Sequence, residues 1–168
     1  MSAPTRGSGA RGLAPWLGLA ALVVVLDQAT KALVQAALAP GERIVVMPFV
    51  DLVLVFNTGA AFSFLADAAG WQRGFFIAVA VGASLLIVHL LRRHAEDRLF
   101  CAGLGLILGG ALGNLWDRVA LGHVVDFVLL HAHGWHFPAF NVADSAITVG
   151  AGLLIWDAVF GKGRAQAA

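Results

Sequence analysis

Two aspartates, Asp126 and Asp144, are the residues whose type and surroundings best suit acid–base chemistry. Each follows an apolar or small run, and neither has an obvious cationic partner nearby in the sequence. Two carboxylates held together cannot both ionise cheaply, so one pKa rises and the pair shares a proton. Such a pair can activate a water and protonate a leaving amine, which hydrolyses a peptide bond. Aspartate also favours helix and turn caps. Because the two lie eighteen positions apart, both interpretations stay open.

Further ionisable and amide residues lie near or within apolar stretches, where a polar side chain is costly and indicates function. They are Asp27, Lys31, Asn57, Asn114, Asp117, Arg118 and Asn141. Asp27 and Lys31 are four residues apart, which puts them on one helical face and predicts an ion pair. That pair either neutralises itself within a helix bundle or also shapes a cleft. Arg118 offers a planar fork of donors, and we expect it to hold the carboxylate of Asp117 or a neighbour.

The composition shows what kind of protein must position these residues. The chain has 168 residues, of which 60% are hydrophobic and only 12% are charged, whereas soluble domains carry about 25% charged residues. We therefore predict an integral membrane protein that forms a single domain over residues 1–168. The net charge of +1 gives no reason to expect a nucleic-acid partner, and the single Cys101 excludes an internal disulfide.

Four apolar runs, at residues 13–39, 74–91, 99–116 and 142–160, are candidates for membrane spans, since a span needs about 20 residues. The tails at 1–12 and 161–168 are small and polar, and we expect them to be disordered. The first run also looks like a secretory signal, but Asp27 and Lys31 interrupt the approach to the small-residue site and argue against cleavage.

Basic residues predict how the four spans are oriented, because lysine and arginine gather on the cytoplasmic side. Seven of the eleven fall on one side of a four-span chain: Arg6, Arg11, Arg92, Arg93, Arg98, Lys162 and Arg164. Both termini are therefore expected to be cytoplasmic, and segments 40–73 and 117–141 to face outward. The polar residues crowd toward the outer ends of the spans, where they can converge on one outward-facing cleft.

The outer segments contain strand-like stretches. "RIVVMPFVDLVLVFN" is rich in Val, Ile and Phe and is broken by Pro48, which predicts two short strands. "HVVDFVLL" predicts another strand, and "HAHGWHFP" after it is expected to be a loop. The predicted fold class is thus a mainly α membrane protein, with four transmembrane helices and a small, cradle-like β element on the outer face.

Glycines in the third run predict close helix packing. Gly105, Gly109 and Gly113 recur every four residues on one helical face, and small residues at this spacing let helices approach. Gly110 lies beside the polar cluster, so a second role for it, besides packing, stays open.

Other chemistries have weaker support in the sequence. His123, His131, His133 and His136 match no strong zinc signature. There is no G-x-S-x-G nucleophile elbow and no glycine-rich phosphate loop with a following lysine. We expect neither a metal nor a cofactor, and the role of the histidine-rich loop 131–136 stays open.

Five blocks together resemble the bacterial lipoprotein signal peptidases, or signal peptidase II family. They are "DQATK" from Asp27, "NTGAAFS" from Asn57, "GGALGNLWDR" from Gly109, "VVDF" from Val124 and "FNVADSAI" from Phe140. Each block alone is weak, but all five occur in the family's order on four spans. The resemblance covers about residues 13–160 and departs only in the tails and around loop 131–135.

The resemblance implies an aspartyl endopeptidase of the bacterial inner membrane with Asp126 and Asp144 as its catalytic pair. Residues that match the family's active-site support are Asn57, Asn114, Arg118, Asn141, Asp27 and Lys31, with Gly110 beside them. The implied substrates are prolipoproteins with diacylglycerol on the cysteine after the signal peptide, cut just before that cysteine. Membrane lipid is the implied surrounding, no cofactor is implied, and we expect a monomer.

Two other functional classes also use polar residues within spans. A transporter would place them at the midplane, with broken helices and repeats, whereas here they crowd one end. A non-enzymatic assembly subunit would use them for helix contacts, which the glycine face permits.

Overall fold

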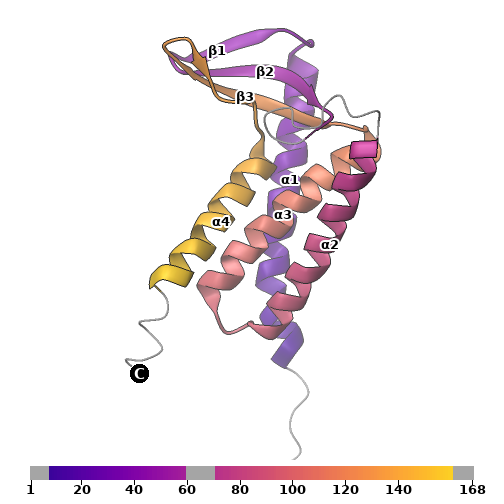
Figure 1. Ribbon diagram of the computed structural model, residues 1–168, viewed down its shortest axis with the longest axis vertical. Helices are drawn as coiled ribbons and strands as arrows, with labels where there is room; N and C mark the ends of the chain where they lie inside the picture. The colour runs from indigo at the N-terminus through magenta and orange to yellow at the C-terminus, as the bar shows by residue number, and fades with distance from the viewer. Residues whose placement is uncertain (1–7, 60–70, 161–168) are drawn as a thin grey trace, which may run out of the picture.

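Four long helices form the bulk of the protein in this computed structural model, which describes residues 8–59 and 71–160 (Figure 1). They are α1 (Ser8–Ala37), α2 (Trp71–Arg93), α3 (Arg98–Ala120) and α4 (Val142–Phe160). All four are long and apolar enough to cross a membrane, which confirms the predicted mainly α, four-span class. Helix α1 begins at Ser8, so the prediction that residues 8–12 belong to a disordered tail is wrong. The same prediction for residues 1–7 and 161–168 lies outside the described residues.

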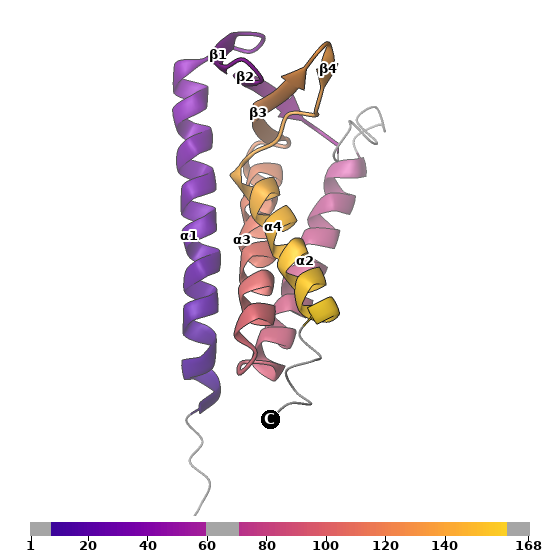
Figure 2. The same cartoon turned by 90° about the vertical axis from the view of Figure 1, so that its left-hand side faces the viewer.

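Helix α3 packs against each of the other three helices, and Figure 2 shows it beside the length of α1. Its glycines make this possible. A Cβ on Gly109 would lie 2.6 Å from the Val23 Cβ of α1, and one on Gly110 would collide with the Ala143 carbonyl of α4. The glycine face is therefore a packing surface, as predicted, and Gly110 serves the contact with α4.

Both ends of α3 are fixed by hydrogen bonds. The Asp97 carboxylate accepts from the Phe100 N–H (3.1 Å) at the start of the helix, where an N-cap aspartate satisfies a free donor. At the other end, Arg73 of α2 donates to the carbonyl oxygens of Arg118 (2.8 Å) and Val119 (3.0 Å). The helix continues to Ala120, so Arg118 lies within it and not in the connection predicted to begin at residue 117.

A four-stranded antiparallel sheet lies at one end of the bundle, which we call the sheet end (Figure 1). Its strands, in spatial order, are β1 (Arg43–Met47), β2 (Val50–Asn57), β3 (Val124–Ala132) and β4 (Trp135–His136). This confirms the predicted β element. The expectation of a plain loop after β3 is wrong, because His133 (φ 50°) and Gly134 (φ 84°) form a tight turn that allows a two-residue hairpin.

The sheet is attached to the bundle by an apolar cluster. Val34 and Leu38 at the end of α1 pack against Leu54 of β2 and against Val125 and Phe127 of β3. Strand β3 lies next to the segment that leads into α4, since Val128 and Phe140 form a β-bridge. As a result, β3 lies beside Phe140 and Asn141, the two residues that precede α4.

Candidate active site

Asp126 and Asp144, far apart in sequence, meet at the sheet end. Asp126 lies in β3 and is buried, and Asp144 lies in the first turn of α4 and is half-buried. Asn141 joins them, because its Nδ2 donates to Asp126 Oδ1 (2.8 Å) while its backbone N–H donates to Asp144 Oδ2 (3.3 Å). The Asp144 N–H donates back to Asn141 Oδ1 (2.9 Å). This reciprocal pair is a capping box, in which Asn141 caps the start of α4 and Asp144 bonds back to it.

Two more asparagines donate to the carboxylates. Asn57 Nδ2 donates to Asp126 Oδ2 (3.0 Å), and Asn114 Nδ2 donates to Asp144 Oδ1 (2.8 Å). The oxygen of each amide is engaged elsewhere: Asn57 Oδ1 accepts from the Gly59 N–H (3.0 Å), and Asn114 Oδ1 accepts from Lys31 Nζ (3.1 Å). The amides are therefore oriented with their N–H groups toward the carboxylates, which stabilises bound negative charge without a cation in contact.

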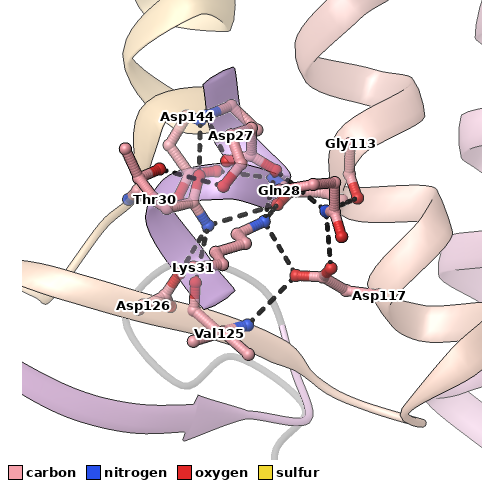
Figure 3. A network of polar contacts seen from close by, with 12 residues as sticks. Asp27, Gln28, Thr30, Lys31, Gly113, Asp117, Val125, Asp126 and Asp144 are labelled. Carbon is pink, nitrogen blue, oxygen red and sulfur yellow. Dashed lines mark hydrogen bonds and ion pairs between the residues drawn. The ribbon is translucent and has the colours of Figure 1, made fainter. Parts of the chain in front are cut away.

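A buried ionic network lies next to the aspartates and the asparagines that donate to them (Figure 3). Lys31 is 1% exposed, and its Nζ lies 2.7 Å from Asp27 Oδ2 and 2.7 Å from Asp117 Oδ2. Gln28 Nε2 also donates to Asp117 Oδ1 (2.8 Å). The ion pair predicted between Asp27 and Lys31 is confirmed, and it extends to a second carboxylate on α3.

The same network fixes the start of α4 and the course of β3. Asp27 Oδ1 accepts from the Ala143 N–H (2.9 Å), which is one of the free donors at the N-terminus of α4. Asp117 Oδ2 accepts from the Val125 N–H (3.2 Å), next to Asp126. A Cβ on Gly113 would lie 2.7 Å from Asp27 Oδ2, so this glycine makes room for the carboxylate. The ionic network thus positions both elements that carry the aspartates.

Arg118 does not hold a carboxylate, contrary to our prediction, among residues 8–59 and 71–160. Its Nη2 donates to the Gly59 carbonyl (3.0 Å) and its Nη1 to the Asn114 carbonyl (3.3 Å), while its guanidinium lies 5.0 Å from the centre of the Phe76 ring. The physical reason is that backbone carbonyls and an aromatic face already surround the guanidinium. Arg118 thus anchors Gly59, two residues after Asn57 at the end of β2.

Burial changes the acidity of Asp126. Loss of water around the carboxyl raises the pKa of Asp126 to about 7, and the nearby Asp144 charge adds to this. The amide donors of Asn57 and Asn141 act in the opposite direction. Asp126 therefore keeps a proton up to near-neutral pH, so that the pair carries one negative charge and one proton.

Asp126 and Asp144 line the same small cavity. It has a volume of about 60 Å³ and is lined by Asp126, Asp144, Asn57, Asn114, Arg118, Val124 and Ala139. That is room for a few water molecules. The arrangement of two carboxylates, one proton and space for water can support hydrolysis by acid–base catalysis.

Both the fold and the sequence of this chain are similar to those of known proteins. A solved bacterial membrane enzyme superposes with a TM-score of 0.80 at 32% identity, covering 88% of each chain. Lipoprotein signal peptidases from Paraburkholderia phymatum and a Janthinobacterium strain are 54% and 55% identical over 157 and 150 residues. These matches cover 94% and 89% of this chain, and 92% and 91% of the relatives. A family model described as signal peptidase (SPase) II matches residues 19–160.

The chain belongs to the signal peptidase II family. It is a multi-pass membrane protein and a peptidase of the aspartic class. This membership sets aside the transporter and assembly-subunit alternatives. The matched region contains every residue that the sequence suggested for the site.

Some residues of this signal peptidase II site were not predicted. Gln28 contacts Asp117, and its signal was visible as an amide inside an apolar run beside Asp27. Gly59 was not singled out, because its role depends on backbone hydrogen bonds to Asn57 and Arg118. Such contacts use the backbone carbonyl or N–H, which nearly every residue has, so the residue type does not indicate them.

The histidine-rich segment has a role outside the dyad. His131 Nε2 lies 2.8 Å from Asp51 Oδ2, and Arg43 Nε lies 2.6 Å from the same oxygen. Asp51 is fully buried, so Arg43 of β1 compensates its charge, while the His131 ring of β3 lies within hydrogen-bond distance of the same oxygen. In the described part of this signal peptidase II chain, no three His, Cys, Asp or Glu residues gather as metal ligands.

Proposed function

We propose that the protein is an aspartyl endopeptidase that removes the signal peptide from diacylglyceryl-modified prolipoproteins, cutting just before the lipidated cysteine. The observation that carries this proposal is the meeting of Asp126 and Asp144 across a cavity large enough for water. The family to which the chain belongs, and the relatives named as lipoprotein signal peptidases, support the substrate class.

The reaction follows from two carboxylates with one proton. The ionised carboxylate takes a proton from the water while the water oxygen attacks the carbonyl carbon of the scissile bond. The protonated carboxyl gives its proton to the carbonyl oxygen, which forms a neutral tetrahedral diol. A proton then moves to the amide nitrogen, the C–N bond breaks, and the products are a carboxyl group on the signal peptide and a free amine on the cysteine. The pair acts as one titrating unit, so both steps belong to the dyad.

The membrane setting explains why this chemistry lies at the end of a helix bundle. The scissile bond lies between a hydrophobic signal segment and a cysteine with lipid attached, at the edge of the bilayer. Carboxylates in the hydrocarbon are costly, so a single shared proton and several amide donors reduce the charge that must be buried. Asp144, in the first turn of α4, stands at this depth.

The sheet end is proposed to face outward from the inner membrane, with both termini in the cytoplasm. The α2–α3 connection carries Arg92, Arg93 and Arg98 around it, and it lies at the end of the bundle opposite the sheet (Figure 1). Basic residues next to spans mark the cytoplasmic side. Both aspartates and their amide partners come from one chain, which supports action as a monomer.

The position of the cut provides the test of this function. Purified protein in detergent is given a prolipoprotein with a diacylglyceryl cysteine and, in parallel, the same polypeptide without lipid, and product masses are read by mass spectrometry. We expect a product that begins at the lipidated cysteine, and little product from the unlipidated chain. A cut elsewhere, or equal cleavage of both substrates, would contradict the proposal.

A further inference from the structure

An apolar groove runs along the first turns of α4, on the side away from the ionic network. It has a volume of about 410 Å³, and its apolar lining comes from Leu130, Phe137, Phe140 and Val149. Asp144 also lines it. Because Asp144 lines the dyad cavity as well, the groove leads directly to the proposed site of cleavage.

The hydroxyl groups in this α4 groove do not make it polar. Ser145 Oγ donates to the Asn141 carbonyl (2.9 Å), and Thr148 Oγ1 donates to the Asp144 carbonyl (2.8 Å). Both hydroxyls are thus used within their own helix. The carbon atoms of these side chains are left to contact an occupant, so the groove favours an apolar ligand.

The α4 groove opens on the flank of a membrane-spanning helix. Val149 is 56% exposed, and only 11% of the α4 span is buried inside the protein. In a bilayer such a flank faces hydrocarbon. An acyl chain can therefore pass from the lipid into the groove without crossing a polar surface.

The volume of the groove suits a flexible chain better than a helix lying fully inside it. An α-helix with side chains is about 10–12 Å across and rises about 5.4 Å per turn, so 410 Å³ would hold about one turn. A flexible hydrocarbon chain fits a narrow space of this kind.

A second groove, on the sheet side of the dyad, has a different character. It has a volume of about 520 Å³, and its polar lining comes from Asp126, Asn57, Thr58 and His136. The rest of its lining is apolar: Val53, Val55, Phe56, Leu129, Phe137, Pro138 and Ala139. Phe137 lines both grooves. Polar groups of this kind suit a peptide backbone, which leaves the α4 groove as the apolar branch of the site.

From this contrast we propose that the α4 groove binds an acyl chain of the substrate's diacylglyceryl group, and that Val149 and Thr148 determine which chains fit. The inference rests on the proposed function and adds to it the place of the lipid. A lipid held beside Asp144 would set the distance of the adjacent peptide bond from the dyad.

The test varies the groove and the lipid together. Steady-state kinetics are measured for wild type and Val149→Trp with two synthetic substrates, whose diacylglyceryl groups carry short or long acyl chains. Leu85→Trp is the matched control, because Leu85 is 68% exposed and lines another apolar groove, between α1, α2 and α3, that contains neither aspartate. Val149→Phe provides a second variant of smaller volume.

We expect Val149→Trp to raise KM for the long-chain substrate about tenfold, the effect of displacing about two methylenes from an apolar site. Its kcat, and its KM for the short-chain substrate, stay near wild type, which also shows that the variant is folded. Leu85→Trp matches wild type throughout. Unchanged kinetics of both Val149 variants, or equal losses with short and long chains, would overturn the lipid assignment. A folded wild type that cleaves neither substrate would instead remove the proposed function, and this inference with it.

Discussion

Asp126→Asn and Asp144→Asn are each expected to lower the cleavage rate by about 10³-fold or more, because a carboxamide can neither take a proton from water nor give one to the carbonyl oxygen. Asn at 144 can keep its oxygen toward Asn114 Nδ2, but its NH₂ group then replaces the oxygen that accepts from the Asn141 N–H, so this variant should stay folded with some loss of stability. Asn at 126 places one NH₂ group against the amide donors of Asn57 or Asn141 and should lose some stability as well. Activity is measured on the lipidated substrate, and folding by thermal unfolding in detergent.

Asp157→Asn is the control for these variants, because Asp157 lies on the same helix α4 near its far end. It should retain wild-type activity. Substantial cleavage by a folded Asp144→Asn variant would remove Asp144 from the mechanism. The double variant should be no worse than the more severe single variant, because residues that act as one unit are not additive.

Lys31→Met is expected to destabilise the protein by about 3–5 kcal/mol, the cost of removing one partner from a buried ion pair. Lys31 lies 2.7 Å from both Asp27 and Asp117, and all three side chains are at most 1% exposed. Without the ammonium, two buried carboxylates lose their counter-ion. Asn114 also loses one of the two donors, Lys31 and Asn141, that orient its amide, so kcat should fall in whatever protein remains folded. Thermal unfolding and steady-state kinetics measure the two effects.

A second substitution separates the charge from the side-chain volume. Adding Asp27→Asn to Lys31→Met removes one of the uncompensated carboxylates, so the double variant should unfold at a higher temperature than Lys31→Met alone. If Lys31→Met unfolds at the wild-type temperature, Lys31 does not compensate these charges and the network is not the support of the site.

The sequence predicted those features that depend on local pattern. Apolar runs of the right length marked the four spans, and the spacing of four between Asp27 and Lys31 predicted their ion pair. The glycine face of α3 predicted close packing, which its contacts with α1 show. Each of these signals lies within one helix or one short segment, where residue spacing decides which side chains share a face.

Features that depend on the meeting of distant segments were not predictable in the same way. Nothing in the spacing of Asp126 and Asp144 indicates that β3 lies beside the residues that precede α4, and Asn141 joins the two aspartates only because of that placement. The expectation for Arg118 was wrong because the backbone carbonyls of Gly59 and Asn114 accept its hydrogen bonds. Backbone partners are invisible in the residue types.

The pH dependence of kcat/KM on the lipidated substrate tests most directly the claim that Asp126 and Asp144 work as a pair sharing one proton. Burial raises the pKa of Asp126 to about 7, so its proton is held below that pH and lost as the pH rises through it. We expect kcat/KM to fall above about pH 7, because the pair then loses its one proton. The fall should approach tenfold per pH unit well above that pH. A value that stays level or rises between about pH 7 and pH 9, as a basic nucleophile would produce, would contradict the aspartyl mechanism.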